Sequence, residues 1–201
     1  LACSVLLAAL NCKQNGNTPA QPQKPSLPTR ASAVRVTIGW DYQNLPLRME
    51  IYEPATQQQL YFWQTGVVKP PQKPPVSLYI ENGEFWQRPG SAKIFVLTMK
   101  NDTTKPVHFF AAPHHVTPPE YSLGFHFNCL CVNHVFTVNP GETWYRVVRL
   151  LLHKEHRGDK LTIRHVLIAA GDEQMKAFSD NPTLHKHIEA NEKKHTEQGE
   201  N

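Results

Sequence analysis

Cys129 and Cys131 are separated by one residue in the run FHFNCLCV, and their type and spacing suit them to chemistry. If this run is a β-strand, alternate side chains share a face, so Phe125, Phe127 and both cysteines point the same way. At a rise of about 3.3 Å per residue the two cysteine Cα atoms lie roughly 6.6 Å apart, near the upper limit for an unstrained disulfide. A metal ion bound between the sulfurs would relieve that strain.

Two thiolates favour a soft metal ion. Thiolate ligands select Cu(I) or zinc, and two of them without an obvious third and fourth ligand suit Cu(I) better than tetrahedral zinc. His134, shortly after Cys131, is the candidate third ligand, and His114 and His115 are weaker candidates. The alternative is that both cysteines are small hydrophobic residues of a core strand, because cysteine is among the most buried residue types.

We expect the other histidines not to bind metal. His108 and His126 are strand residues that hydrogen bonds would satisfy, whereas His153, His156 and His165 fall at or beyond a strand end and show no ligand spacing. The last three histidines of the chain lie in a polar segment, which predicts that they are exposed to solvent.

Two other chemistries fit the pattern less well. A blue-copper electron carrier needs two histidines, a cysteine and usually an axial methionine close together. Met175, the only methionine after His134, lies in the polar C-terminal segment. A cysteine hydrolase would pair Cys131 with His134 as its base, but no oxyanion-binding element or orienting acid is apparent. We therefore expect a protein that is not an enzyme.

The N-terminal part predicts a membrane tether. Residues 1–12 begin with the apolar run LACSVLLAAL, typical of the end of a secretory signal or of an anchor. Cys12 follows this run and is a candidate for lipidation; the alternative is a thiol beside a membrane anchor. Residues 13–33 are rich in Pro, Gln, Asn and Lys and predict a flexible linker. Both interpretations place the following domain outside the cytoplasm, on the periplasmic side of a membrane.

Alternating hydrophobicity begins at Val34 and continues to about residue 170. Turn residues such as Pro140-Gly141 separate the alternating runs, and no helical run intervenes, which predicts an all-β, immunoglobulin-like sandwich over residues 34–170. Residues 171–201 predict a polar tail, with a short helix beginning near Asn181. The expected strands are 34–40, 47–53, 59–65, 76–81, 92–100, 107–112, 125–132, 143–152 and 161–169.

Composition excludes several classes of protein. The formal net charge is only +4, with scattered basic residues, which does not predict nucleic-acid binding. No stretch reaches the roughly 18 consecutive apolar residues of a membrane-spanning helix, so a polytopic membrane protein is not expected. The run VVKPPQKPP at residues 67–75 predicts an exposed loop of polyproline conformation.

Residues 101–142 resemble the central signature of the CtaG-type cytochrome c oxidase assembly proteins. The shared features are an Asn, a Lys-Pro-Val, a Thr-Pro, the paired cysteines and a Pro-Gly-Glu turn. Upstream, VRVTIGWDYQNLPLRMEIYEP is similar to the first strands of that family, and the resemblance covers about residues 34–170. Leu130 and Val132 replace phenylalanines of the family, the spacing from Cys131 to Pro140 is one residue longer, and TWYRVVRLLLH lacks the family's Met-Pro start.

The resemblance implies an immunoglobulin-like, membrane-bound domain that delivers Cu(I) to the copper B site of the oxidase through Cys129 and Cys131. We therefore expect a membrane-tethered, extracytoplasmic protein that passes copper by thiolate exchange to an acceptor, a cytochrome c oxidase subunit. The oligomeric state stays open, a homodimer included. The competing expectation is an immunoglobulin-like binding module of a lipoprotein with structural cysteines, which core burial of the sulfurs would favour.

Overall fold

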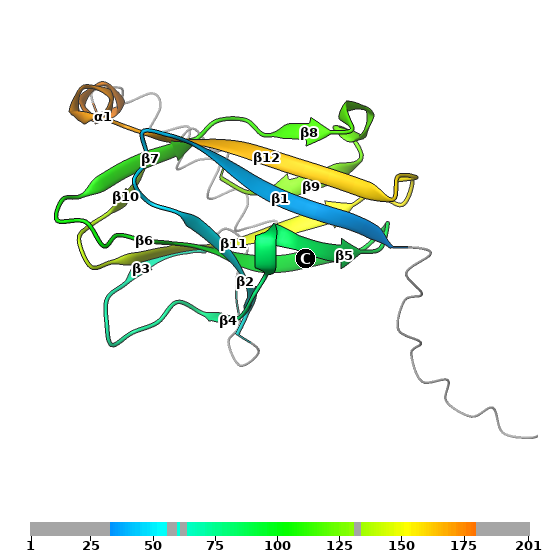
Figure 1. The fold of residues 1–201 in the computed structure, drawn as a ribbon, viewed down its shortest axis with the longest axis horizontal. Coiled ribbons are helices and arrows are strands. Elements are labelled where there is room, and N and C mark those ends of the chain that lie inside the picture. Colours follow the sequence, from blue (N-terminus) through cyan, green and yellow to red (C-terminus); the bar gives the residue numbers. More distant parts are fainter. Residues whose placement is uncertain (1–32, 56–59, 61–63, 131–133, 180–201) are drawn as a thin grey trace, which may run out of the picture.

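The computed structural model describes residues 33–55, 60, 64–130 and 134–179. Within these residues the strands form two six-stranded sheets that pack face to face, as Figure 1 shows. The prediction of an all-β sandwich is confirmed. The expected signal or anchor segment, the linker up to residue 32, and Cys12 lie outside the described residues.

The first sheet is built around its parallel pair of strands, β1 and β12. The strand order is β10-β7-β12-β1-β5, and β8 pairs with the beginning of β12. β1 and β12 run parallel and in register from Arg35 beside Lys160 to Gln43 beside Ile168. The bounds are β1 (Val34–Gln43), β5 (Glu84–Gln87), β7 (Val107–Ala111), β8 (His115–Thr117), β10 (Phe136–Val138) and β12 (Lys160–Ala169).

The second sheet is centred on two long antiparallel strands, β6 and β11. Its order is β3-β11-β6-β2-β4, and β9 pairs with the last residues of β11. The bounds are β2 (Met49–Pro54), β3 (Thr65–Val68), β4 (Val76–Tyr79), β6 (Ala92–Lys100), β9 (Phe125–Asn128) and β11 (Thr143–Leu152). Short helical elements connect or follow the strands: η2 (Glu81–Gly83), η3 (Pro119–Tyr121) and α1 (Asp172–Ser179). No helix of the described residues is long and apolar enough to cross a membrane.

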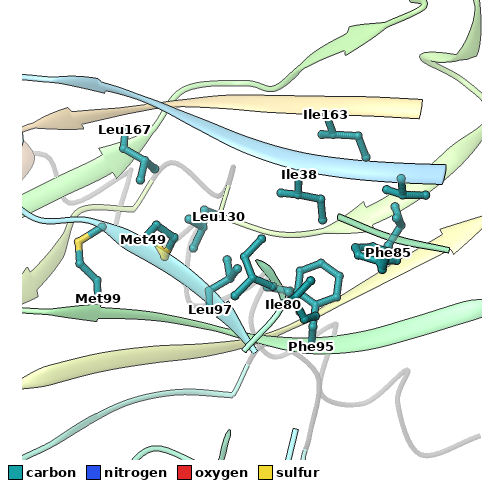
Figure 2. Close-up of a cluster of buried hydrophobic side chains, with 14 of the residues drawn as sticks. Ile38, Met49, Ile80, Phe85, Phe95, Leu97, Met99, Leu130, Ile163 and Leu167 are labelled. Atoms are coloured by element: carbon teal, nitrogen blue, oxygen red, sulfur yellow. The ribbon is translucent and has the colours of Figure 1, made fainter. Parts of the chain in front are cut away.

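The core lies between the sheets and follows from the alternation of the strands. Figure 2 shows Ile163 and Leu167 of β12 facing Phe95 and Leu97 of β6 across the interior, and all four side chains are buried. Burial of each such side chain contributes about 1.5–3 kcal/mol, so the inward rows of the long strands dominate the stability of the sandwich.

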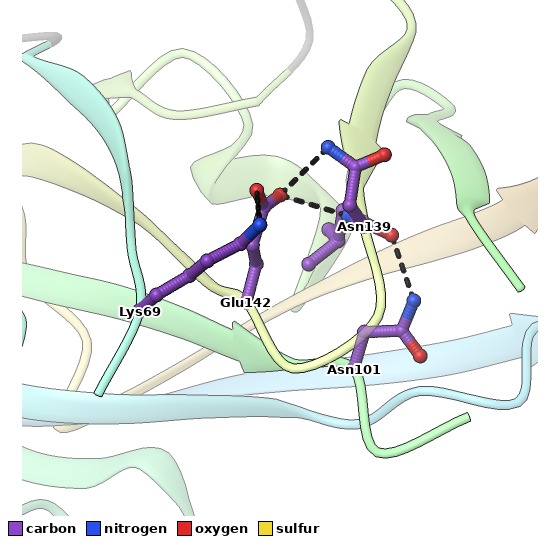
Figure 3. A network of polar contacts seen from close by, with 5 residues as sticks. Lys69, Asn101, Asn139 and Glu142 are labelled. Atoms are coloured by element: carbon purple, nitrogen blue, oxygen red, sulfur yellow. Dashed lines mark hydrogen bonds and ion pairs between the residues drawn. The ribbon is translucent and has the colours of Figure 1, made fainter. Parts of the chain in front are cut away.

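The Pro-Gly-Glu turn between β10 and β11 is fixed by its glutamate (Figure 3). The Glu142 carboxylate accepts hydrogen bonds of 2.9 Å from both the backbone and the side-chain nitrogen of Asn139, and lies 3.4 Å from Nζ of Lys69. The backbone hydrogen bond from Asn139 is the main cause that lowers the pKa of Glu142, with Lys69 assisting. Gly141 has a φ of 74°, a conformation that glycine adopts without strain.

Asn101 joins this turn to the end of β6. Its backbone N–H donates to the carbonyl of Glu142 at 2.9 Å, and its side-chain nitrogen donates to the carbonyls of Val138 at 2.7 Å and Lys105 at 2.9 Å. Its side-chain oxygen accepts from the backbone and the hydroxyl of Thr103. Asn101 is fully buried. Its side chain forms hydrogen bonds with backbone groups of two loops, and these groups would otherwise be left unpaired beside the core.

Several element boundaries differ from the prediction. β5, β8 and β10 were not expected, and the expected strand 125–132 ends at Asn128. Leu130, expected on the face opposite the cysteines, is buried in the same core at 1% exposure. β3 begins at Thr65, while most of the expected strand 59–65 lies outside the described residues. The helix expected near Asn181 also falls on residues outside them, and within them α1 occupies Asp172–Ser179.

Candidate metal centre

Three side chains with metal-binding atoms meet between the two sheets. The sulfur of Cys129 and ring nitrogens of His114 and His165 all lie within 4.8 Å of one another. The three residues are far apart in the chain: His114 directly precedes β8, Cys129 directly follows β9, and His165 lies in the middle of β12. We call this group the His-Cys-His cluster.

His165 enters the cluster because β12 alternates. Leu161, Ile163, His165 and Leu167 form the inward row of this strand, and all four are fully buried. Trp40 is the partner of His165 in the parallel register of β1, and the two rings stack with centroids 5.2 Å apart and planes 21° apart. The indole therefore fixes the imidazole plane from one side.

Cys129 continues the inward row of β9. Phe125 is buried, Phe127 packs against the core, and Cys129 is 4% exposed. The ring of Phe127 lies 5.6 Å from that of His165, so an aromatic side chain borders the cluster on the side of the second sheet as well. The predicted shared face of Phe125, Phe127 and Cys129 agrees with this arrangement, but the sulfur is buried.

His114 is the most exposed member of the cluster, with an intermediate exposure. Its ring lies 5.2 Å from that of His165, at 71°, and 5.6 Å from that of Phe125. The segment before it is attached to β12, because the backbone N–H of Ala112 donates to the carbonyl of Val166 at 2.9 Å. This bond places His114 beside β12 although it belongs to no strand.

The outer face of the β1–β12 pair carries charges that strengthen this part of the sheet. Arg164, next to His165 in sequence, donates two hydrogen bonds to the carboxylate of Asp41. These bonds lower the pKa of Asp41 and raise that of Arg164. The side chain of Arg164 crosses Gly39, where a Cβ would lie 3.0 Å from the guanidinium. A larger residue at position 39 would therefore crowd the side chain that ties β12 to β1.

One thiolate and two imidazoles form a donor set for a soft or borderline metal ion, such as copper or zinc. Around a single ion these atoms would lie about 3.3–3.8 Å apart, given bonds of about 2.0–2.3 Å. The limit of 4.8 Å in the structure exceeds this range by roughly 1 Å, which small side-chain rotations would close. The surrounding Trp40 and Phe127 would keep water from the ion and increase the strength of its electrostatic interactions.

The cluster includes some of the residues that the sequence suggested and leaves out others. It contains Cys129 and the weaker candidate His114. His115 is exposed on β8, and His134 packs with its ring 4.8 Å from that of Phe136; neither belongs to the cluster. Cys131 lies outside the described residues.

Sequence reasoning missed His165. The expectation that it falls at a strand end is wrong, because β12 extends from Lys160 to Ala169. The alternation of Leu161, Ile163 and Leu167 was the available signal, since it assigns the histidine between them to the buried face. The hydrogen bond expected for His108 is present: its Nδ1 lies 2.8 Å from the hydroxyl of Thr137.

A family model described as a domain of unknown function, DUF8709, matches residues 34–170. The chain belongs to this family. The DUF8709 match begins at the first residue of β1 and ends one residue after β12, so it contains both sheets and the whole His-Cys-His cluster. No curated protein matches the chain.

Proposed function

We propose that the DUF8709 domain of this chain binds Cu(I) through the Cys129 thiolate and the imidazoles of His114 and His165, and that it passes the ion to an acceptor protein. The observation that carries this proposal is the convergence of the three donors, within 4.8 Å of one another, from three separate elements. A structural cysteine requires only apolar neighbours, whereas Cys129 has two imidazoles, the ring nitrogens of His114 and His165, beside its sulfur.

Copper(I) suits this donor set better than zinc. Structural zinc sites are almost always four-coordinate, and catalytic zinc sites use three protein ligands and a water. Within the described residues the cluster offers three donors in an apolar surrounding, which matches a low-coordinate, soft ion. Binding would release the proton of the Cys129 thiol, because the thiolate is the ligand.

Transfer would proceed by ligand exchange at the His114 side. His114 is the most exposed of the three donors, so an incoming thiolate or imidazole would add there before a bond to the cluster breaks. The ion stays Cu(I) throughout: the acceptor's lone pair forms the new bond, and the displaced ligand keeps its own lone pair. Repetition of this step moves the ion fully to the acceptor.

The resemblance to the CtaG-type proteins supports the rest of the proposal. It suggests an immunoglobulin-like arrangement of the sandwich, an extracytoplasmic position on a membrane tether, and a cytochrome c oxidase subunit as the acceptor. Cys131, which the resemblance pairs with Cys129, is proposed as a further thiolate that takes part in the exchange.

Anaerobic titration of the reduced full chain with Cu(I), in competition with a chromogenic chelator, tests the proposal. We expect one tightly bound ion per cluster, and Cys129→Ser and His165→Gln should each weaken binding by about 100-fold or more, since loss of outer-sphere partners alone costs 10–100-fold at metal sites. The matched control is His115→Gln, which changes an exposed histidine next to His114. Cys131→Ser measures how much the second cysteine contributes to the affinity for Cu(I).

Three outcomes would contradict the proposal in different ways. Equal affinity in the wild type and Cys129→Ser would remove the cluster as the copper site. Tight binding of zinc but not Cu(I) would keep the site and exclude its assignment to copper. Loss of stability in Cys129→Ala, with no Cu(I) uptake by the wild type, would favour the alternative function, a binding module with a structural cysteine. The burial of Cys129 and Leu130 is the observation that supports this alternative.

A further inference from the structure

One end of the sandwich exposes large apolar side chains beside a basic rim. This is the end at which β1 begins, β5 ends and the loop of residues 153–159 joins β11 to β12; it lies on the right of Figure 1. We call it the Val34 end. It lies away from α1, which is at the opposite end of the molecule in the same view.

Two apolar side chains project from the Val34 end. Trp86 of β5 is 47% exposed, and Leu123, in the loop after η3, is 86% exposed. Trp86 borders a hollow of about 550 Å³ that His156 also lines. The Leu123 loop reaches the same place, because the ring of Tyr121 lies 4.4 Å from that of His156. Both apolar groups therefore lie at the same end of the sandwich.

Charged side chains lie near Trp86. Arg35, Arg157 and Lys160 line the same hollow as Trp86, and Lys154 lies against Gly90, where a Cβ would be 2.8 Å from its Cγ. The basic residues outnumber the acidic ones only slightly, so charge alone would not hold a partner strongly. The basic residues are Arg35, Arg88, Lys154, Arg157 and Lys160, and the acidic ones are Glu84, Glu120, Glu155 and Asp159.

We propose that the Val34 end docks on an anionic lipid bilayer, with Trp86 and Leu123 at the boundary of headgroups and acyl chains and the basic rim on lipid phosphates. Tryptophan favours this boundary because its ring is apolar and its N–H is polar. Lysine and arginine near an anionic leaflet add attraction that decays within a Debye length, so only a rim in contact benefits.

The sequence before the described domain supports the bilayer as the partner. The described structure begins at Ala33, at this end, and the preceding residues include the apolar run 1–10 and the linker 13–33. With the flexibility that its composition predicts, a linker of 21 residues would have a root-mean-square span of roughly 25 Å. An anchored chain would therefore hold the Val34 end near the bilayer at an effective concentration of about millimolar, so weak docking would suffice.

Docking rests on the membrane tether of the proposed function and not on copper binding. It would turn the Val34 end toward the lipid and the α1 end toward the surrounding compartment.

Five large apolar side chains of the described residues are exposed, and the other three, Val67, Leu78 and Tyr79, lie on the edge strands β3 and β4 of the second sheet. They serve as an internal control surface.

Fluorescence quenching by brominated lipids tests the proposal with the full chain and no added copper. Vesicles of phosphatidylethanolamine and phosphatidylglycerol, with brominated acyl chains, should quench part of the emission, because Trp86 is one of four tryptophans. The quenched part should be lost in Trp86→Phe and reduced in Leu123→Ser. It should persist in Leu78→Ser, the matched change of an exposed leucine on β4, and weaken on phosphatidylcholine vesicles.

Each other result overturns the proposal and locates the failure. Co-sedimentation with vesicles but equal quenching in the wild type and Trp86→Phe would leave the tether in place and remove the docking surface. Absence of co-sedimentation would remove the tether as well, while Cu(I) titration would still decide the metal site. A dimer in solution that Leu123→Ser dissociates would assign the Val34 end to a second copy of the chain.

Discussion

Replacement of Asn101 by alanine should destabilise the domain by about 3–5 kcal/mol. The side chain makes four hydrogen bonds of 2.7–2.9 Å, to the carbonyls of Val138 and Lys105 and to the backbone and hydroxyl of Thr103. A net contribution of roughly 0.5–1 kcal/mol for each bond gives about 2–4 kcal/mol. The buried carbonyl of Val138, left without this donor, adds about 1 kcal/mol at the low end of the cost of an unsatisfied group.

Urea unfolding of the full chain, followed by circular dichroism, measures this loss. The urea concentration at the midpoint of unfolding should fall. The slope of the unfolding free energy against urea concentration should stay unchanged, because the substitution does not alter the surface exposed on unfolding. Asp102→Ala is the matched control: its neighbouring ion pair with Lys100 is exposed and should contribute less than about 1 kcal/mol. If Asn101→Ala cost no more than Asp102→Ala, the bridge between the turn and β6 would not be a determinant of stability.

Three further substitutions test the turns and their charges. Gly83→Ala should cost about 2–4 kcal/mol in urea unfolding, because φ is 64° and the new Cβ would lie 2.2 Å from the carbonyl oxygen of Ile38. Gly141→Ala, at a φ of 74° with open space around it, should cost only about 1 kcal/mol; equal losses would refute the steric argument. Glu142→Gln should destabilise the domain at neutral pH, and this difference should vanish as pH falls through the native pKa of Glu142, because Asn139 holds that pKa below the ordinary value. A difference that stayed constant over this acid range would contradict the assigned hydrogen bonds.

The long strands could be predicted from the sequence, and the short ones could not. The boundaries expected for β6 and β11 match the structure, because nine or ten residues rich in apolar side chains, bounded by turn residues, give a strong strand signal. β5, β8 and β10 have three or four residues each, and their conformation depends on the neighbours with which they pair. Local patterns contain no information about such partners.

The site was only partly accessible to the same reasoning. Cys129 and His114 were named as candidates from residue type, but their proximity depends on two separate pairings: β9 with β11, and the segment before His114 with β12. His165 was discounted although it occupies the buried row of β12. Its relation to Cys129 arises from the packing of one sheet on the other, which strand periodicity does not encode.

The parallel pairing of β1 with β12 affects how the protein is made. Two central strands of the first sheet are the earliest and the latest of the domain, with partners such as Val36 and Leu161 more than a hundred positions apart. During translation the first strand must wait for the last one to leave the ribosome, and such distant pairings slow folding and prolong exposure of unpaired edges. Because His165 arrives on that final strand, the three donor side chains cannot assemble on an unfinished chain.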